Sequence, residues 1–206
     1  MIFKKLILKK VKQEIKNEDL KNKLYNILMS NDVVKNINNN IDILLEIIPE
    51  IKDMINFPHN HPHHHLDVWD HTLLALSLSD TDFDVRLALL LHDIGKPHSY
   101  QDKEVRHFKG HPKVSAIIAK KILKKLNYDE DYIRQMCYLI ENHDNAIEEK
   151  DIIKNYELEY KRYLIQYCDT YAHKKDTIEN RVKYLNETKC LLYEYQQEDI
   201  FFVKRK

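Results

Sequence analysis

Glycine is almost absent from this chain, whose 206 residues contain only two, Gly95 and Gly110. A Rossmann dinucleotide-binding fingerprint needs three glycines in one short loop, and a P-loop needs two glycines beside a lysine. The sequence therefore excludes nucleotide binding through a glycine-rich loop. Prolines number only five, and so few chain-breaking residues favour long helices over many turns.

The charges of the chain balance, with 33 lysines and arginines against 33 aspartates and glutamates. No net charge therefore draws the protein to nucleic acid or to a membrane. The cysteines, Cys137, Cys168 and Cys190, lie far apart and form no CxxC pair, which fits a reduced compartment. Lysines interrupt the apolar runs at the N-terminus too often for a signal peptide or a membrane span. We therefore expect a cytoplasmic protein that contacts no membrane.

Apolar residues recur at helical spacing along most of the chain. The helices expected from this pattern cover residues 41–55, 68–78, 84–92, 112–126, 129–143, 157–171 and 177–197. The third of these is apolar on nearly all sides and should be buried. Gly95 should adopt the left-handed conformation past its end, and Asn36–Asn40 should form a turn. Because no segment alternates at period two, the predicted fold is all α.

Residues 1–40 are rich in lysine and carry isoleucine and leucine at helical spacing. We divide the chain into this helical N-terminal extension and a catalytic domain of residues 41–206. Two interpretations of the extension stay open. It is either an amphipathic helix that packs on the domain or a basic docking surface for RNA or another partner.

Histidines and aspartates from separate predicted helices form the candidate metal site. The chain has 12 histidines. The candidate ligands are His71, His92, Asp93, His111, His143 and Asp169. Imidazole and carboxylate ligands suit a divalent Fe, Mn, Co, Ni, Zn or Mg ion. No cysteine lies near these residues in the sequence, which argues against a structural thiolate zinc site.

The pair His92-Asp93 is the most informative of these residues, because it ends the most apolar helix. Neighbouring residues within a helix diverge by about 100° around its axis, but at a helix end the backbone can turn both toward one ion. A buried polar pair without partners costs roughly 2 kcal/mol or more. The pair must therefore be hydrogen-bonded or bound to metal.

Residues near these ligands are candidates for substrate binding. Lys96 follows the pair in a tight turn and could hold a phosphate oxygen, or could be a solvated cation at the helix end. Arg106, His107 and Lys109 precede His111 in sequence. They could rim a substrate pocket, or could be solvated loop charges.

Two further residues are candidates for catalysis. His65 belongs to the histidine-rich loop of residues 59–65. It could enter the site as a proton donor or phosphate contact, or the loop could be a polar surface segment with incidental metal affinity. Asp144 directly follows His143 and is either a catalytic carboxylate or a helix-end cap.

The set His71, His92-Asp93 and Asp169 resembles the HD superfamily of metal-dependent phosphohydrolases. The run LLLHDIGKP at residues 89–97 looks like the central motif of that family. The resemblance covers roughly residues 43–172. It implies an HD-domain helical bundle, which the N-terminal extension would precede.

Residues 47–76 further resemble the HD region of CCA-adding enzymes, the tRNA nucleotidyltransferases. A Pro-Glu pair, a histidine six residues before the metal histidine and a VWxHT run occur together there. The corresponding residues here are Pro49-Glu50, His65 and Val68 to Thr72. The nucleotidyltransferase head of those enzymes carries a Gly-Gly motif ahead of the HD region. This chain has no glycine before Gly95, so nucleotidyl transfer is not expected.

The resemblance implies one or two metal ions. His71, His92, Asp93 and Asp169 would hold the first, and Asp93 would bridge to a second held by His111 and His143. Such ions activate water and polarise a phosphoryl oxygen. The implied activity is hydrolysis of a phosphomonoester or phosphodiester, with a small phosphate ester or nucleotide as substrate. The alternative is a weakly catalytic or non-catalytic HD module that binds tRNA or other RNA.

Overall fold

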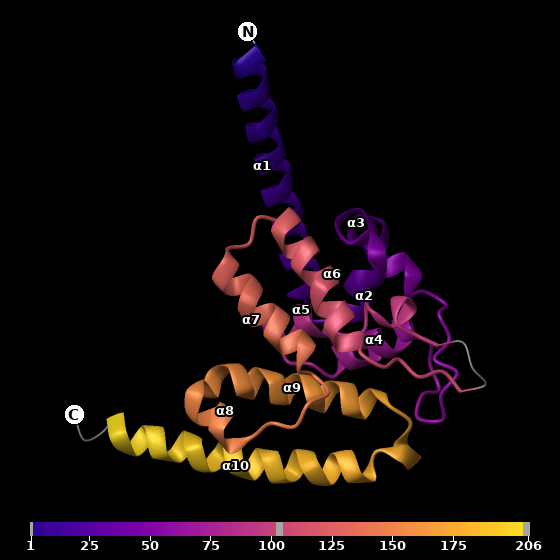
Figure 1. Cartoon of the computed structure of the whole chain (residues 1–206), viewed down its shortest axis with the longest axis vertical. Coiled ribbons are helices and arrows are strands. Elements are labelled where there is room, and N and C mark those ends of the chain that lie inside the picture. Colours follow the sequence, from indigo (N-terminus) through magenta and orange to yellow (C-terminus); the bar gives the residue numbers. More distant parts are fainter. Residues whose placement is uncertain (1, 102–104, 204–206) are drawn as a thin grey trace.

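A computed structural model describes residues 2–101 and 105–203, with side chains for residues 7, 9–101 and 105–197. These residues form α-helices and short 3₁₀ helices and contain no β-strand, which confirms the all-α prediction (Figure 1). In chain order the elements are α1 (Ile2–Leu28), α2 (Val33–Asn39), α3 (Ile41–Ile47), η1 (Pro49–Asp53), α4 (Val68–Ser77), α5 (Phe83–Leu91), η2 (Lys96–His98), α6 (His111–Lys125), α7 (Glu130–Glu141), α8 (Glu149–Lys154), α9 (Tyr156–Ala172), η3 (Lys175–Thr177) and α10 (Glu179–Val203). No helix among the described residues is long and apolar enough to cross a membrane.

Helix α5 lies at the centre of the bundle. Every residue from Val85 to Leu91 is buried, and the helix contacts α1, α4, α6, α7 and α9. Burial of a leucine-sized side chain contributes roughly 1.5–3 kcal/mol, so this run of leucines anchors the core. The burial predicted for the helix at residues 84–92 is therefore confirmed. Its end carries His92 and Asp93 into the interior.

Arg86 is the charged residue within the buried run 85–91 of this helix. Its Nη1 donates to the carbonyl oxygens of Leu28, at 2.6 Å, and Ser30, at 2.8 Å. Carbonyls at a helix C-terminus carry partial negative charge, which favours a cation there. The contact fastens the end of α1 to α5.

The two ends of α1 differ. Its first half projects from the bundle (Figure 1), whereas Leu20, Leu24 and Leu28 lie in the same core cluster as residues of α4 and α5. Packing therefore continues across the domain boundary predicted at residue 40, and that boundary stays a prediction.

Aspartates set where three of the core helices begin. The side chains of Asp67, Asp82 and Asp129 accept hydrogen bonds from backbone N–H groups in the first turns of α4, α5 and α7. Such a cap stabilises a helix by typically about 1 kcal/mol. The cap at Asp67 places His71 in the first turns of α4, on its buried side.

Two expected elements differ from the structure near the N-terminus. The helix predicted over residues 41–55 is two elements, because α3 ends at Ile47 and Pro49 begins the 3₁₀ helix η1. A proline disfavours helical geometry at the residue before it. The predicted turn at Asn36–Asn40 is also wrong, since residues 36–39 complete α2 and Asn40 separates α2 from α3.

Gly95 is needed for a different reason from the one predicted. Its φ is −85°, outside the left-handed region. A Cβ at this position would lie 2.5 Å from the backbone nitrogen of Ser115 and 2.8 Å from the carbonyl oxygen of His111. The glycine therefore lets the turn after α5 touch the start of α6. That approach brings Asp93 close to His111.

The C-terminal helices form a second layer beneath the core. Helix α10 runs beside α9 in Figure 1, and α8 packs against both. A small apolar cluster that includes Ile152, Tyr163, Leu185 and Leu192 joins the three helices. This layer places the N-terminal end of α10 beside Asp144 and Asp169.

Candidate metal centre

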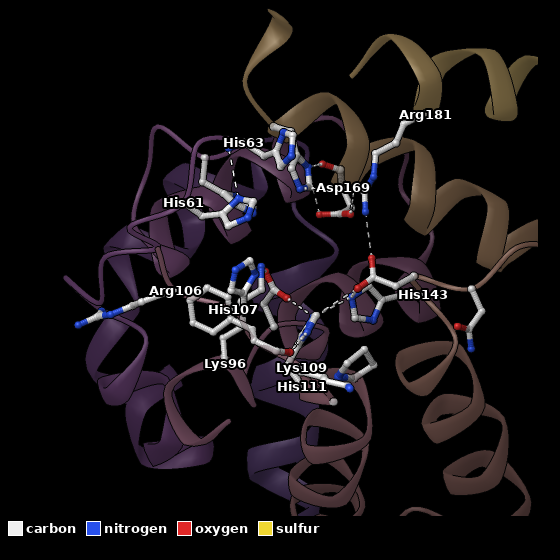
Figure 2. A pocket seen from close by; sticks show the side chains of 18 of the residues that line it. His61, His63, Lys96, Arg106, His107, Lys109, His111, His143, Asp169 and Arg181 are labelled. Carbon is white, nitrogen blue, oxygen red and sulfur yellow. Dashed lines mark hydrogen bonds and ion pairs between the residues drawn. The ribbon is translucent and has the colours of Figure 1, made fainter. Parts of the chain in front are cut away.

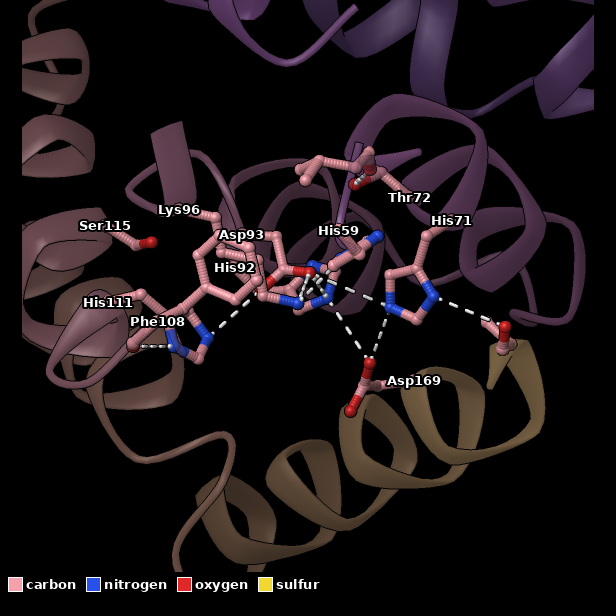
Figure 3. A network of polar contacts seen from close by, with 12 residues as sticks. His59, His71, Thr72, His92, Asp93, Lys96, Phe108, His111, Ser115 and Asp169 are labelled. Atoms are coloured by element: carbon pink, nitrogen blue, oxygen red, sulfur yellow. Dashed lines mark hydrogen bonds and ion pairs between the residues drawn. The ribbon is translucent and has the colours of Figure 1, made fainter. Parts of the chain in front are cut away.

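The first of two ligand triads lies inside the bundle. His71 comes from α4, His92 follows α5 and Asp169 comes from α9, and all three are buried. Their ligand atoms lie within 4.8 Å of one another. His71 Nε2 is 2.8 Å and His92 Nε2 is 3.5 Å from Asp169 Oδ1 (Figure 3). An ion at their centre would be within reach of two imidazoles and a carboxylate.

The second triad lies at the ends of helices. Asp93 follows α5, His111 opens α6 and His143 follows α7. His111 Nε2 is 3.1 Å from Asp93 Oδ1 and 3.3 Å from His143 Nε2. The structure thus brings together all six ligands predicted from the sequence, in two groups of three.

The Asp93 carboxylate stands between the two triads. Its Oδ2 faces the first triad, 3.3 Å from His92 Nε2 and 3.7 Å from His71 Nε2. Its Oδ1 faces His111 of the second. Both oxygens are buried, and neither accepts a hydrogen bond of good geometry from any described residue, although Lys96 Nζ lies 2.6 Å from Oδ2. A buried carboxylate without full hydrogen bonding is costly unless a cation compensates it.

The four imidazoles present the same ring nitrogen, Nε2, to the centre. In each ring Nδ1 faces a backbone carbonyl, which can only accept, so Nδ1 carries the proton and Nε2 points to the centre. The pairs are His71 with Ala172, His92 with Leu89, His111 with Phe108 and His143 with Ile140, at 3.3, 2.7, 3.0 and 2.7 Å. Such outer hydrogen bonds are what fixes metal-binding histidines in proteins.

The charges in the centre also suit a cation. Burial disfavours a charge on His92, but Asp93 and Asp169 outweigh burial and raise the pKa of His92 to about 9. Burial likewise opposes ionisation of Asp93, yet His92 and Lys96 hold the Asp93 pKa well below its ordinary value. Without an ion, a proton on His92 thus offsets the two carboxylates. A bound metal would replace that proton.

Lys96 is buried within the site rather than solvated at the helix end. Only 5% of the residue is exposed. Besides Asp93, its Nζ contacts His59 Nε2 at 3.1 Å. Burial and the charge of Lys96 lower the pKa of His59 to about 3, so this imidazole stays neutral and accepts from the ammonium.

The histidine-rich loop contributes histidines other than the one predicted. His65 is exposed and does not line the cavity beside the triads. His59 is instead buried, and its ring stacks on His64 with centroids 3.7 Å apart. His59 Nδ1 faces the carbonyl oxygen of Leu66 at 2.9 Å. This contact holds His59 inside the loop, and His65 points outward.

Asp144 lies beside the second triad. Its Oδ2 is 3.7 Å from His111 Nε2 and 3.6 Å from His143 Nε2. Its Oδ1 is 3.2 Å from Nη2 of Arg181, a residue of α10. Asp144 therefore faces the centre rather than capping a helix end, and it stays a catalytic prediction.

A cavity of about 840 Å³ opens over the second triad (Figure 2). The predicted rim residues Arg106, His107 and Lys109 all line it. Arg106 also donates to the carbonyl of Pro58 at 2.8 Å and lies over the rings of Phe57 and Tyr100. Its guanidinium points away from the centre in Figure 2, so Arg106 clamps the loop at the rim.

Four residues beside the triads were not predicted from the sequence: His59, His64, His173 and Arg181. The density of histidines in residues 59–65 signalled that this loop mattered but not which ring faces inward. Arg181 lies on a long helix of mixed polar and apolar residues, with no motif around it. No local signal could have assigned it to the site.

Comparison with known proteins agrees with this geometry. The HD domain family model matches residues 63–186, a span that contains all six ligands. The CC-adding tRNA nucleotidyltransferase of Thermus thermophilus is 32% identical over 100 residues, covering 44% of this chain and 23% of the relative. The A-adding tRNA nucleotidyltransferase of Deinococcus radiodurans is 34% identical over 86 residues, 38% of this chain and 20% of the relative.

The chain thus spans about a fifth of the length of the curated relatives it matches. The described part of the chain holds no separate head domain beside the helical bundle.

Proposed function

Because the chain belongs to the HD domain family, we propose that it is a metal-dependent phosphohydrolase acting on a phosphomonoester or phosphodiester, with a nucleotide as the expected substrate. The observation that carries the proposal is the Asp93 carboxylate. One buried oxygen faces each ligand triad, and that arrangement suits a carboxylate shared by two divalent ions.

The donor set fits such ions. The triads together offer four imidazole nitrogens and two carboxylates, a set that divalent Fe, Mn, Co, Ni and Zn accept. When bound, these ions lower the pKa of a coordinated water and polarise a phosphoryl oxygen. The remaining chemistry comes from the residues of the chain.

Those residues would orient the substrate and hold the charge of the centre. The carbonyl partners of the four Nδ1 groups keep each Nε2 in place as reaction proceeds. Lys96 Nζ, held by Asp93 and His59, would place a positive charge beside the reacting phosphoryl group. His107 and Lys109, which line the cavity, would attract an anionic substrate.

The test is hydrolysis after controlled reloading with metal. Chelator-treated protein is supplied with Mn, Co, Ni, Zn or Mg and given aryl phosphate monoesters and diesters and cyclic nucleotides. We expect metal-stimulated release of product. The Asp93→Ala variant should lose it while remaining folded by circular dichroism. Equal activity in Asp93→Ala and wild type would refute the proposal.

A second candidate is RNA binding without hydrolysis. The two relatives are tRNA nucleotidyltransferases by name, and the projecting half of α1 exposes Lys9, Lys10, Lys12 and Lys16. Binding through phosphate contacts weakens steeply with salt, because counterions are released. Salt-sensitive tRNA binding that survives metal removal, in protein that hydrolyses none of the esters, would favour this candidate.

A further inference from the structure

Arg181, near the start of α10, spans the outer side of both triads. Its Nη1 is 3.2 Å from Asp169 Oδ2, and its Nη2 is 3.2 Å from Asp144 Oδ1. The opposite oxygen of Asp169 faces the imidazole of His71, and the opposite oxygen of Asp144 faces His111. One guanidinium thus contacts a carboxylate on each side of the centre (Figure 2).

The guanidinium of Arg181 has N–H donors that are not used in these contacts. Arginine carries five N–H groups. Nη1 uses two of them, on Asp169 and on His173 Nε2 at 3.4 Å, and Nη2 uses one on Asp144. Among the described residues, no acceptor is present for the second N–H of Nη2 or for the N–H of Nε. The side chain is 41% exposed, so these donors can meet a ligand.

The position of Arg181 is where a ligand would enter. It lines both the cavity of about 840 Å³ and a second cavity of about 260 Å³. The two cavities also share His143, Asp144 and Asp169. A phosphoryl group lying against the second triad would therefore be next to the Arg181 guanidinium, whichever cavity holds the rest of the substrate.

Two other cations near the centre, Lys96 and Arg106, are less free to bind a phosphate. Lys96 is 5% exposed and held by Asp93 and His59. Arg106 is bound to the loop at the rim. Arg181 combines contact with both carboxylates and open donors.

We propose that Arg181 is a substrate-binding residue whose guanidinium holds a non-bridging oxygen of the phosphoryl group at the junction of the two cavities. This inference rests on the proposed phosphohydrolase function. A guanidinium recognises phosphate with parallel N–H donors in a planar fork. Because the pair with Asp144 is partly exposed, it is weak enough to be exchanged for a phosphate oxygen. The bond to Asp169 can remain and orient the guanidinium.

The test compares the full-length wild type with Arg181→Gln, Arg181→Lys and a matched control, Arg134→Gln. Arg134 is an exposed residue of α7 that pairs with Asp131 and lines neither cavity. Each manganese-loaded protein is measured in three ways: ion content, affinity for inorganic phosphate by calorimetric titration, and KM and kcat with an aryl phosphate diester. The titration needs no turnover.

We expect Arg181→Gln to bind inorganic phosphate about tenfold or more weakly, because a hydrogen bond to a charged group is lost. Its KM should rise in proportion, with ion content unchanged and kcat changed far less. Arg181→Lys should recover part of the affinity, and Arg134→Gln should match wild type.

Two results would overturn the assignment. One is an unchanged phosphate affinity in Arg181→Gln. The other is loss of metal in that variant, which would show that Arg181 supports the carboxylates instead of binding substrate. If wild type hydrolyses no ester, the proposed function fails, yet the phosphate titration still decides the role of Arg181.

Discussion

The two triads use similar ligands but differ in access. His71 and His92 of the first triad are fully buried and line neither cavity. Asp93, His111 and His143 of the second triad all line the larger cavity. His71 and Asp169 of the first triad lie within helices α4 and α9, whereas His111 and His143 of the second stand at helix ends. Of the first triad only Asp169 reaches the cavities, so we expect substrate to arrive at the second triad.

The triads also differ in the proton they hold without metal. Although burial opposes it, the pKa of His92 is raised to about 9 by Asp93 and Asp169. Burial instead lowers the pKa of His143 in the second triad. An ion entering the first triad would have to displace the proton of His92, whereas an ion entering the second would meet the neutral imidazole of His143. We therefore expect a metal ion to exchange slowly at the first triad and more readily at the second.

Removal of the residue shared by both triads should have the largest effect. Asp93→Ala should abolish binding of both ions and lower kcat/KM by about 10³-fold or more, because metal activation contributes several kcal/mol. Elemental analysis and a steady-state assay measure this. The control is Asp131→Ala, an exposed residue of α7. Two ions retained in Asp93→Ala would contradict the shared role.

Removal of one histidine from each triad should separate the two sites. His143→Ala should keep the ion of the first triad and lower activity by about 10²-fold, with little change in Tm. His92→Ala should lose the first ion and also lower Tm clearly, since it leaves Asp93 and Asp169 buried with less compensation, at a cost of about 3 kcal/mol or more. Equal ion loss and equal Tm in the two variants would mean that the triads are equivalent.

The proton on His92 predicts how the stability of metal-free protein depends on pH. The pKa of His92 is about 9 in the folded state against an ordinary value of 6.5. The stabilisation is therefore complete below about pH 6.5 and is lost as pH rises through about 9, amounting to a few kcal/mol. Thermal unfolding of chelator-treated protein should show this decline.

Metal-loaded protein should not show the same decline, because its His92 is already a neutral ligand and metal affinity rises as protons leave. His92→Asn provides the control, since its metal-free form should lose most of the slope. Parallel pH profiles for metal-free and metal-loaded wild type would contradict the account of the first triad.

The smallest effects are expected in the histidine-rich loop. His59→Ala should lower kcat/KM by roughly tenfold, because Lys96 loses the acceptor that positions it. His59→Gln should restore part of the activity. His65→Ala should stay within about twofold of wild type, as is usual for an exposed residue. A larger loss in His65→Ala than in His59→Ala would show that the loop is arranged differently from the structure.

The sequence allowed the fold class and the central pair to be predicted because both depend on local pattern. A run of leucines ending in His92-Asp93 defines a buried helix with polar residues at its inner end. The role of Gly95 was mistaken, since the contact with Ser115 that requires it joins residues that only the tertiary fold brings together.

The outer residues of the site could not be predicted for a related reason. Which ring of residues 59–65 faces inward depends on contacts of His59 with Lys96 and Leu66. Arg181 reaches the site because α10 packs on α8 and α9. The residues around Arg181 do not predict this position. The apolar residues of α10 indicate only that the helix packs in a small cluster away from the centre.

The central claim is that two divalent ions lie on either side of the Asp93 carboxylate. Anomalous scattering from crystals of manganese-loaded protein tests it directly. We predict two peaks about 3.5–4 Å apart, one beside His71, His92 and Asp169 and the other beside His111 and His143. A single peak, or ions held by other residues, would contradict the claim.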